Sequence, residues 1–163
     1  MQQDLILARD TVEALLCLGA TLGTAESCTG GLIAKMITDV AGSSAVFSGA
    51  LVTYTNEAKC KLLGVSPSLI EQESEVSYAC AEAMAQGARR ALGVTFALST
   101  TGYAGPAGGT EKDPVGTVYL ALDTPTGTVS ERFSAPPEST RQEVRFLAAH
   151  RALTLLAEHL AQA

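Results

Sequence analysis

The stretch Ala25–Gly31 reads AESCTGG and joins two segments of contrasting character. Residues 14–24, just before it, are largely apolar and strand-like. After it, apolar residues recur at helical spacing, namely Leu32, Ile33, Met36, Ile37 and Val40. The pattern therefore predicts a strand-to-helix turn, which is where α/β folds place phosphates, nucleophiles or ordinary helix caps.

Outward from this turn, predicted strands and helices alternate along the chain. Strands are expected at residues 20–25, 45–55, 94–100, 116–123 and 128–134, the last two as a hairpin. Helices are expected at residues 1–19, after Gly31, at 57–63, after Pro67, between Ser77 and Gly93, and after Ser139. We therefore predict an α/β fold in which residues 1–163 form a single three-layer α/β/α domain around a mixed sheet of about five strands.

Three local details of this prediction depend on short segments. Residues 45–55, AVFSGALVTYT, are apolar enough for a strand that is buried on both faces. Asn56 is predicted to cap the short helix that follows, with Gly64 as its stop. Ser139 and Gln142 match a capping box for the last helix.

The composition restricts the classes of function. Hydrophobic residues make up 47% of the chain and charged residues 17%, so the chain can bury one good core. A formal net charge of −6 argues against a nucleic-acid binder, which usually has a basic surface, but is compatible with small anionic substrates. The apolar runs are too short to span a membrane.

The cysteines and the N-terminal segment indicate the compartment. Cys17, Cys28, Cys60 and Cys80 include no CxxC pair, so neither a zinc site nor a thioredoxin-type motif is supported. The first residues lack the basic and apolar regions of a signal peptide. We therefore expect a cytoplasmic protein with reduced thiols, no metal and no cofactor. A homo-oligomer is also expected, although no residue pattern carries that expectation.

Ser27 is the candidate nucleophile, because free amides of the following helix would stabilise an oxyanion or hold a phosphate. Gly30 and Gly31 would let a ligand approach the backbone closely. Alternatively, Ser27 or Thr29 is only an N-cap, and Cys28 is either a second candidate nucleophile or a thiol packed behind the turn. Neither the GxSxG elbow of α/β-hydrolases nor a P-loop occurs in the sequence.

Lys59 is the candidate base for that nucleophile. It falls in the first turn of the short helix, where the helix dipole and burial would lower the pKa of its ammonium group. Tyr54, at the end of the preceding strand, would relay a proton or orient the amine. The alternatives are a solvated Lys59 and a core Tyr54 with an exposed hydroxyl. His150 and His159 face opposite sides of the last helix, so a Ser-His-Asp triad has little support.

Segment 100–116 carries five glycines among its seventeen residues and follows a predicted strand. If the strands are parallel, this loop lies at the same sheet edge as Ser27, where open α/β sheets bind ligands. Its amides would complete an oxyanion hole or hold a phosphate, unless the loop is only a surface excursion. Arg141 and Arg145, one turn apart on the last helix, would reach a phosphate or form a solvated, salt-bridged face.

Five motifs follow one another in the order and spacing of a known family: AESCTGG, GSSAVFSGALVTYTNEAK, GVSPSLIE, TGYAGPAGG and DPVGTVYLAL. From about Leu5 to Leu160 the chain resembles the CinA C-terminal domain family, whose stand-alone members are nicotinamide-nucleotide amidohydrolases. The resemblance implies hydrolysis of the amide of nicotinamide mononucleotide, a small-molecule nucleotide substrate, to nicotinate mononucleotide and ammonia, without a metal. It also implies a serine nucleophile assisted by a lysine and a tyrosine, which by motif are Ser27, Lys59 and Tyr54.

We expect substrate-binding residues in the turn, in the glycine-rich loop and on the last helix. They are Cys28, Thr29, Gly30, Gly31, Thr101, Gly102, Gly105, Gly108, Gly109 and Arg145. The family usually has GAVS at residues 74–77, where this chain reads SEVS, a small aliphatic residue at Tyr103, and glycine or aspartate at Ala107. Tyr103 and Glu75 therefore bring bulk, and Glu75 also charge, to positions that the ligand passes. The alternative function is a non-catalytic nucleotide-binding or regulatory module of the same family.

Overall fold

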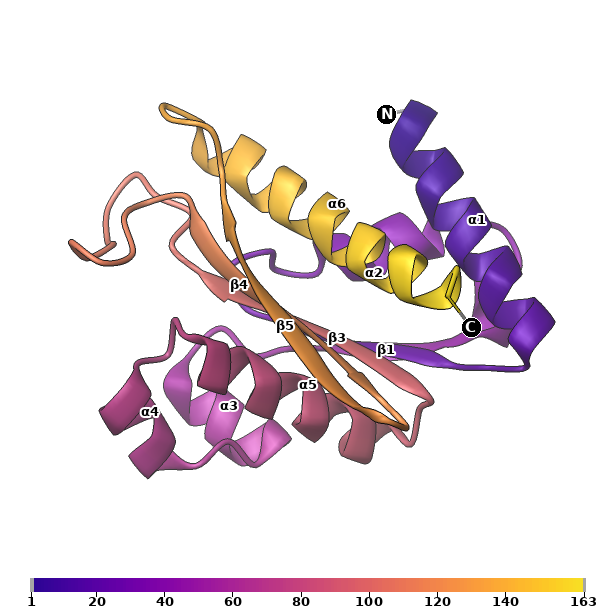
Figure 1. Cartoon of the computed structure of the whole chain (residues 1–163), viewed down its shortest axis with the longest axis horizontal. Helices are drawn as coiled ribbons and strands as arrows, with labels where there is room; N and C mark the ends of the chain where they lie inside the picture. The colour runs from indigo at the N-terminus through magenta and orange to yellow at the C-terminus, as the bar shows by residue number, and fades with distance from the viewer. Residues whose placement is uncertain (1, 163) are drawn as a thin grey trace.

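Five strands form one mixed sheet in the order β2-β1-β3-β4-β5. In Figure 1 the labelled strands β1, β3, β4 and β5 run between two layers of helices. The computed structural model describes residues 2–162, with side chains from Leu5 onward. The strands are β1 (Leu22–Glu26), β2 (Phe47–Val52), β3 (Phe96–Gly102), β4 (Thr117–Thr124) and β5 (Gly127–Ser134). Strand β1 is parallel to β2 and β3, whereas the β3–β4 and β4–β5 pairs are antiparallel. The carboxyl ends of β1, β2 and β3 therefore meet at one edge of the sheet.

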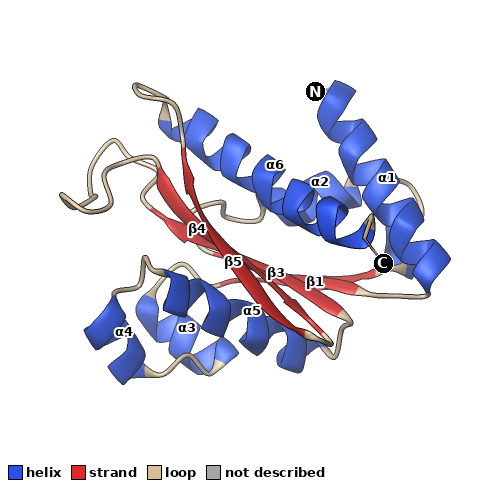
Figure 2. Cartoon of the chain, viewed as in Figure 1, coloured by secondary structure: helices blue, strands red, loops and turns tan. Residues whose placement is uncertain are grey.

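Helices cover both faces of the sheet, as Figure 2 shows. One face carries α1 (Gln2–Leu18), α2 (Leu32–Thr38) and α6 (Arg141–Leu160). The other carries α3 (Asn56–Leu63), α4 (Pro67–Glu73) and α5 (Tyr78–Leu92). A short 3₁₀ turn, Ser43–Ala45, precedes β2. This arrangement confirms the predicted three-layer α/β/α architecture with a mixed sheet.

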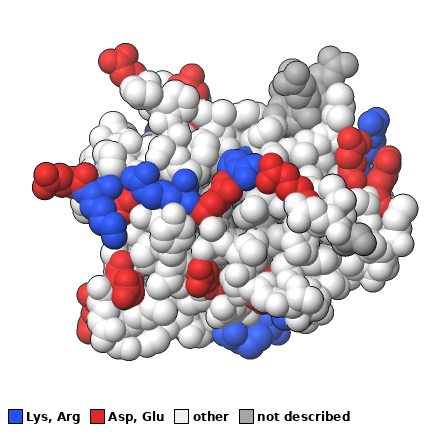
Figure 3. All heavy atoms as spheres, viewed as in Figure 1, with Lys and Arg blue, Asp and Glu red and all other residues white. Residues whose placement is uncertain are grey.

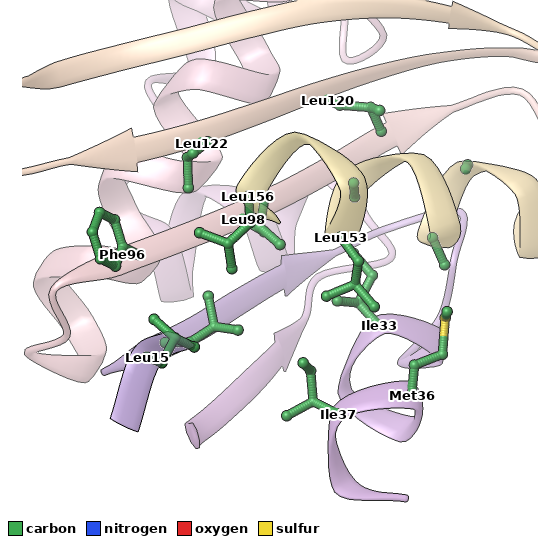
Figure 4. Close-up of a cluster of buried hydrophobic side chains, with 14 of the residues drawn as sticks. Leu15, Ile33, Met36, Ile37, Phe96, Leu98, Leu120, Leu122, Leu153 and Leu156 are labelled. Atoms are coloured by element: carbon green, nitrogen blue, oxygen red, sulfur yellow. The ribbon is translucent and has the colours of Figure 1, made fainter. Parts of the chain in front are cut away.

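The larger core lies between the sheet and helices α1, α2 and α6 (Figure 4). Each of these elements contributes fully buried aliphatic side chains, among them Leu15, Ile33, Ile37, Leu98, Leu153 and Leu156. Burying one such side chain stabilises the fold by roughly 1.5–3 kcal/mol relative to leaving it exposed. A smaller cluster, which includes Leu63 and Met84, packs α3 and α5 against the opposite face. Strands β1 and β3 are thus held from both sides, which fixes where the turn after each of them begins.

The prediction that residues 45–55 form a strand buried on both faces is wrong. Strand β2 covers only Phe47–Val52 and lies at the edge of the sheet, where Val52 is 46% exposed. Local hydropathy reports how apolar a strand is, but it does not report the strand order, and an edge strand is paired on one side only.

The predicted cap of α3 is wrong by one residue. Thr55, rather than Asn56, precedes the helix, and its hydroxyl accepts a hydrogen bond from Ala58 N at 3.1 Å. The predicted stop at Gly64 is confirmed, because this glycine ends the helix with a left-handed φ of 69°.

The capping box of α6 is also shifted by one residue. Thr140 and Glu143 form it, rather than Ser139 and Gln142. Neighbouring residues of capping type compete at both helices, and only the backbone conformation at the helix start decides which one caps.

The surface carries charges of both signs. They alternate in a band across the face shown in Figure 3, where no large basic patch is present. Arg151, for example, forms ion pairs with Glu131 and Glu158 at 2.6 and 3.0 Å. Within residues 2–162, no helix has the length and apolar character needed to cross a membrane.

Candidate active site

A cavity of about 350 Å³ opens at the carboxyl edge of β1 and β3, a volume in the range of roughly 300–1,000 Å³ that is common for small-molecule sites. Its lining comes from five separate segments of the chain: Ser27, Cys28, Tyr54, Thr55, Asn56, Lys59, Glu75, Val76, Thr101, Gly102, Tyr103, Ala104 and Arg141. The expected site residues outside the lining are Thr29, Gly30, Gly31, Gly105, Gly108, Gly109 and Arg145. The fold therefore brings Ser27, Lys59 and Tyr54 to one cavity.

Directly before Ser27, the fully buried carboxylate of Glu26 holds the turn together. Its two oxygens accept five hydrogen bonds, three from amides at the start of α2 and two from hydroxyls. The donors are Gly31 N (2.9 Å), Ile33 N (3.2 Å), Ala34 N (3.0 Å), Thr29 Oγ1 (2.7 Å) and Thr24 Oγ1 (3.2 Å). A buried carboxylate needs such partners, and a negative charge at a helix N-terminus is favourable. Glu26 thus fixes the geometry between β1 and α2, a role that was not predicted from the sequence.

The expectation that free amides of α2 hold an oxyanion or phosphate is wrong, because Glu26 occupies them. The Gly30 amide is also used, since it donates to the Ser27 carbonyl at 3.0 Å. Among the described residues, the amides of Cys28 and Thr29 bond to no other residue. Of the two residues only Cys28 lines the cavity, so its amide is the donor of this turn that a ligand can still engage.

Arg145 braces the same turn from α6. Its guanidinium donates to the carbonyls of Cys28 (3.0 Å) and Thr29 (2.9 Å). Gly30 lies against it with a φ of 60°, and a Cβ added there would meet Arg145 Nη2 at 3.0 Å. Glycine therefore permits both the left-handed backbone and the close approach of the guanidinium. The donors of Arg145 point to the backbone of the turn rather than to the cavity.

Ser27 and Lys59 meet in the cavity wall. Lys59 Nζ donates to Ser27 Oγ at 3.1 Å and to the carbonyl of Thr53 at 3.1 Å. The Lys59 side chain is only 2% exposed, so it is not the solvated lysine of the alternative interpretation, whereas Lys61 is exposed. Burial lowers the pKa of Lys59 from its ordinary value. A neutral amine at this distance can accept the hydroxyl proton of a serine.

The thiol of Cys28, next to Ser27, is protonated near neutral pH. Burial raises the pKa of Cys28 to about 12, and that of Cys80 behind Lys59 to about 11. A thiol with such a pKa stays protonated near neutral pH, and the protonated form is a poor nucleophile. The geometry and the protonation state therefore both favour Ser27 over Cys28 as the nucleophile.

Tyr54 is 57% exposed and lines the cavity beside Arg141. Arg141 Nη2 donates to the Tyr54 hydroxyl at 2.7 Å, and Arg141 Nη1 donates to the Gly105 carbonyl at 2.6 Å. These bonds join the segment before α3, the glycine-rich loop and the start of α6. In the described part of the chain, the Tyr54 hydroxyl bonds to neither Ser27 nor Lys59, so this geometry contains no direct relay through it.

The glycine-rich loop is anchored at its far end by the buried carboxylate of Asp113. It accepts hydrogen bonds from Tyr119 Oη and from Arg132 Nε, both at 2.9 Å. At the near end, Ala104 lines the cavity, and its amide bonds to no other residue within the described chain. The loop is therefore tied to β4 and β5, and its Ala104 amide lies in the same cavity wall as Ser27.

The histidines lie on α6 away from the cavity lining. His150 packs near Phe146 and His159 near Phe96, with ring centroids 6.5 and 5.7 Å apart. Neither is placed to act on Ser27. Among the side chains that the structure describes, no group of three or more His, Cys, Asp or Glu is placed to hold a metal ion.

Curated relatives align with most of this chain. The profile of the CinA C-terminal domain matches residues 5–160. A CinA-like protein from Myxococcus xanthus is 51% identical over 150 residues, which cover 91% of this chain and 35% of that protein. A CinA-like protein from Geobacter sulfurreducens is 56% identical over 125 residues, which cover 76% of this chain and 30% of that protein. The chain thus spans about a third of the length of these relatives.

Two solved structures superpose on this chain over nearly the whole length of both chains. The competence/damage inducible protein CihA from Agrobacterium tumefaciens is 40% identical with a TM-score of 0.92, covering 97% of this chain and 95% of its own. A CinA superfamily protein from Klebsiella pneumoniae is 32% identical with a TM-score of 0.93, covering 98% of this chain and 99% of its own. With the profile match and the identities above, these likenesses show that the chain belongs to the CinA C-terminal domain family.

Proposed function

We propose that this chain is a serine-dependent amidohydrolase that converts nicotinamide mononucleotide and water to nicotinate mononucleotide and ammonia. The observation that carries the proposal is the 3.1 Å hydrogen bond between Lys59 Nζ and Ser27 Oγ in the wall of the cavity. The reaction class follows from this pair, since a serine with an amine base can form an acyl-enzyme. The choice of substrate rests on the resemblance to the stand-alone members of the family.

In the first half of the reaction, the neutral amine of Lys59 takes the hydroxyl proton of Ser27 while Oγ attacks the carboxamide carbon. The charge that develops on the amide oxygen needs nearby donors, for which the free amides of Cys28 and Ala104 are the candidates. As the C–N bond breaks, Lys59 returns the proton to the leaving nitrogen. Ammonia departs, and the acyl group stays as an ester on Ser27.

In the second half, water attacks the ester carbon and Lys59 accepts its proton. That proton passes to Ser27 Oγ as the bond between Oγ and the acyl carbon breaks. One water is consumed, one acid and one ammonia are formed, and both side chains return to their starting states. The Thr53 carbonyl, which accepts a bond from Lys59 Nζ at 3.1 Å, keeps the amine directed at Ser27.

The phosphate of the substrate needs a cation, and we propose Arg141 for this role. Arg145 was the expected residue, but its donors hold the carbonyls of Cys28 and Thr29, whereas Arg141 lines the cavity. A guanidinium can bind phosphate through two parallel hydrogen bonds. Tyr54, which accepts a bond from Arg141, would then act by placing this guanidinium.

The test is ammonia release from nicotinamide mononucleotide by the purified protein, with thermal unfolding followed in parallel. Turnover that is lost in Ser27→Ala supports the enzyme. Stabilisation by the mononucleotide without any ammonia release would instead support the non-catalytic binding module. The same release assay across a panel of pyridine carboxamides, with and without the ribose phosphate, would identify the preferred substrate.

Three expectations about the whole protein stay predictions. They are a cytoplasmic location, a homo-oligomeric state, and the folding of residues 1–163 as one independent domain. Light scattering coupled to size-exclusion chromatography measures the oligomeric state directly, and fractionation of cells measures the location.

A further inference from the structure

One carboxylate lines the cavity without an ionic partner. Glu75 is half-buried in the segment between α4 and α5 and belongs to the cavity wall. Among the described residues, its carboxylate accepts one long hydrogen bond, from Ser74 Oγ at 3.4 Å, and forms no ion pair. A half-buried carboxylate without a cation beside it leaves a negative potential in the adjoining cavity.

The position of Glu75 is fixed by its backbone. Thr101 Oγ1 donates to the Glu75 carbonyl at 2.6 Å, and Ser77 Oγ donates to the Ser74 carbonyl at 2.9 Å. Ser74 itself has a φ of 78° and a ψ of 154°, a region that glycine occupies far more readily than serine. Such strained residues persist where the surrounding structure holds them, and they occur often at ligand sites. Glu75 is therefore held at the cavity rather than placed there by a mobile loop.

The cavity contains opposite charges that do not pair with each other. Arg141 is held by Tyr54 and by the Gly105 carbonyl, and no ion pair between Arg141 and Glu75 occurs in the described chain. Lys59 also lines the cavity, but it must be neutral to act as a base. A ligand that carries one positive and one negative group would satisfy both remaining charges.

We propose that Glu75 recognises the positive charge of the substrate ring, so that the cavity selects amides on a cationic ring over amides on a neutral one. The inference rests on the proposed function, because nicotinamide mononucleotide carries a cationic pyridinium ring and an anionic phosphate. Its reduced form keeps the carboxamide, ribose and phosphate but has a neutral dihydropyridine ring. Glu75 distinguishes the two rings, and Arg141 treats their phosphates alike.

A second effect of Glu75 has to be separated from this one. Its negative charge also raises the pKa of Lys59, against the larger lowering by burial. The buried thiols of Cys28 and Cys80 face the same amine, but they stay protonated near neutral pH. An effect through the base changes the rate of turnover, whereas binding can be measured for both forms of the substrate in a protein without the nucleophile. An effect on the ring changes the ratio between them.

The test is calorimetric binding of oxidised and reduced nicotinamide mononucleotide to the Ser27→Ala protein, which removes the nucleophile and so prevents turnover. Adding Glu75→Gln keeps the shape of the side chain and removes its charge. We expect binding of the oxidised form to weaken about tenfold, with binding of the reduced form unchanged. Glu73→Gln, which removes an exposed carboxylate outside the cavity lining, is the matched control and should change neither.

The inference is overturned if Glu75→Gln leaves both affinities unchanged or weakens both by the same factor. Glu75→Ala serves as a second variant, and melting temperatures confirm that each protein is folded. Ammonia release by the wild-type protein separates this test from the proposed function. A charge preference without ammonia release would contradict only the proposed function, and turnover without a charge preference would contradict only the role of Glu75. Absence of binding by either form would contradict both.

Discussion

The core beneath α1, α2 and α6 and the carboxyl edge of β1 and β3 are built on opposite principles. In the core, Leu98, Leu153 and Leu156 are fully buried among other apolar side chains, and their contacts are non-directional (Figure 4). At the edge, the buried side chains include Glu26 and Lys59, and each is held by specific hydrogen bonds. Both regions are buried, but a substitution in the core removes apolar contacts, whereas a substitution at the edge breaks specific hydrogen bonds.

The edge also contains groups that the fold leaves incompletely bonded. Within the described residues, the buried hydroxyl of Thr53 has no hydrogen-bond partner, and the amides of Cys28 and Ala104 bond to no other residue. A buried polar group without a partner lowers the free energy of unfolding. Proteins keep such groups mainly at functional sites. Stability therefore resides mainly in the leucine-rich core, whereas the residues of the proposed reaction lie at the polar edge. Substitutions in the two regions should therefore produce separable effects.

Ser27→Ala is expected to separate the effect on activity from the effect on stability most strongly. Removing the nucleophile should lower kcat by on the order of 10³-fold or more, because no other hydroxyl replaces it. The melting temperature should change little, since the lost hydroxyl accepts a single bond from Lys59. Steady-state ammonia release and thermal unfolding measure the two effects. Cys28→Ala is the control and should keep most activity. Near-normal turnover by a folded Ser27→Ala protein would remove the acyl-enzyme mechanism.

Lys59→Arg should lower kcat by roughly 10²-fold or more, because a guanidinium keeps the charge but does not deprotonate in the relevant range. Nucleotide affinity should stay similar, and Lys61→Arg, at an exposed position, should remain active. The proposed mechanism requires neutral Lys59, so kcat/KM should fall as the pH drops through the pKa of Lys59 in the free enzyme. Burial lowers that pKa, which places the acidic limb below the ordinary value for lysine. A Lys59→Arg enzyme with normal kcat and an unchanged limb would show that another group takes the proton.

Leu153→Ala should show the reverse pattern in the core. Leu153 is fully buried, and truncation of such a leucine lowers the free energy of unfolding by about 2–5 kcal/mol. The kcat of the molecules that remain folded should be close to that of the wild type, because α6 contacts the edge through Arg141 and Arg145. Urea unfolding and initial rates at low temperature measure the two quantities. A tenfold loss of kcat in folded Leu153→Ala would mean that core and edge are not separable.

Prolonged treatment with EDTA should have the smallest effect. The proposed reaction uses Ser27, Lys59 and backbone amides, so chelation should leave the rate of ammonia release unchanged. The measurement is the initial rate before and after dialysis against the chelator. Activity that disappears and then returns with added zinc would contradict the serine mechanism.

The sequence predicted those parts of the fold that short-range patterns encode. The turn at residues 25–31, the β4–β5 hairpin and the helix stop at Gly64 follow from glycine positions and hydrophobic periodicity. The edge position of β2 does not, because strand order depends on pairing between distant segments. The one-residue shifts at Thr55 and Thr140 arose where two adjacent residues both have capping side chains.

In the candidate site, too, the sequence predicted what is local and missed what depends on contacts between distant segments. Ser27 and Lys59 each have a local signal, but their 3.1 Å contact spans 32 positions and needs the parallel β1–β2 pair. The sequence offered both Arg141 and Arg145 for a phosphate and placed Arg145 in the binding set, but Arg141 lines the cavity. The two lie on the same helix face, so only the position of α6 along its axis decides which one reaches the cavity. Glu26 was missed because its role appears only when five donors from separate positions converge on it.

The carboxylate of Glu26 also has a consequence for cooperativity. It joins β1 to the first turn of α2, and the next residue is Ser27, so α2 cannot detach at its start without exposing an unpaired charge. Local opening of this region is therefore coupled to opening of the central sheet, although α2 has only seven residues. In hydrogen-exchange terms, the amides of Gly31, Ile33 and Ala34 should be protected nearly as long as those of β1. The turn that carries Ser27 would then persist as long as the sheet itself.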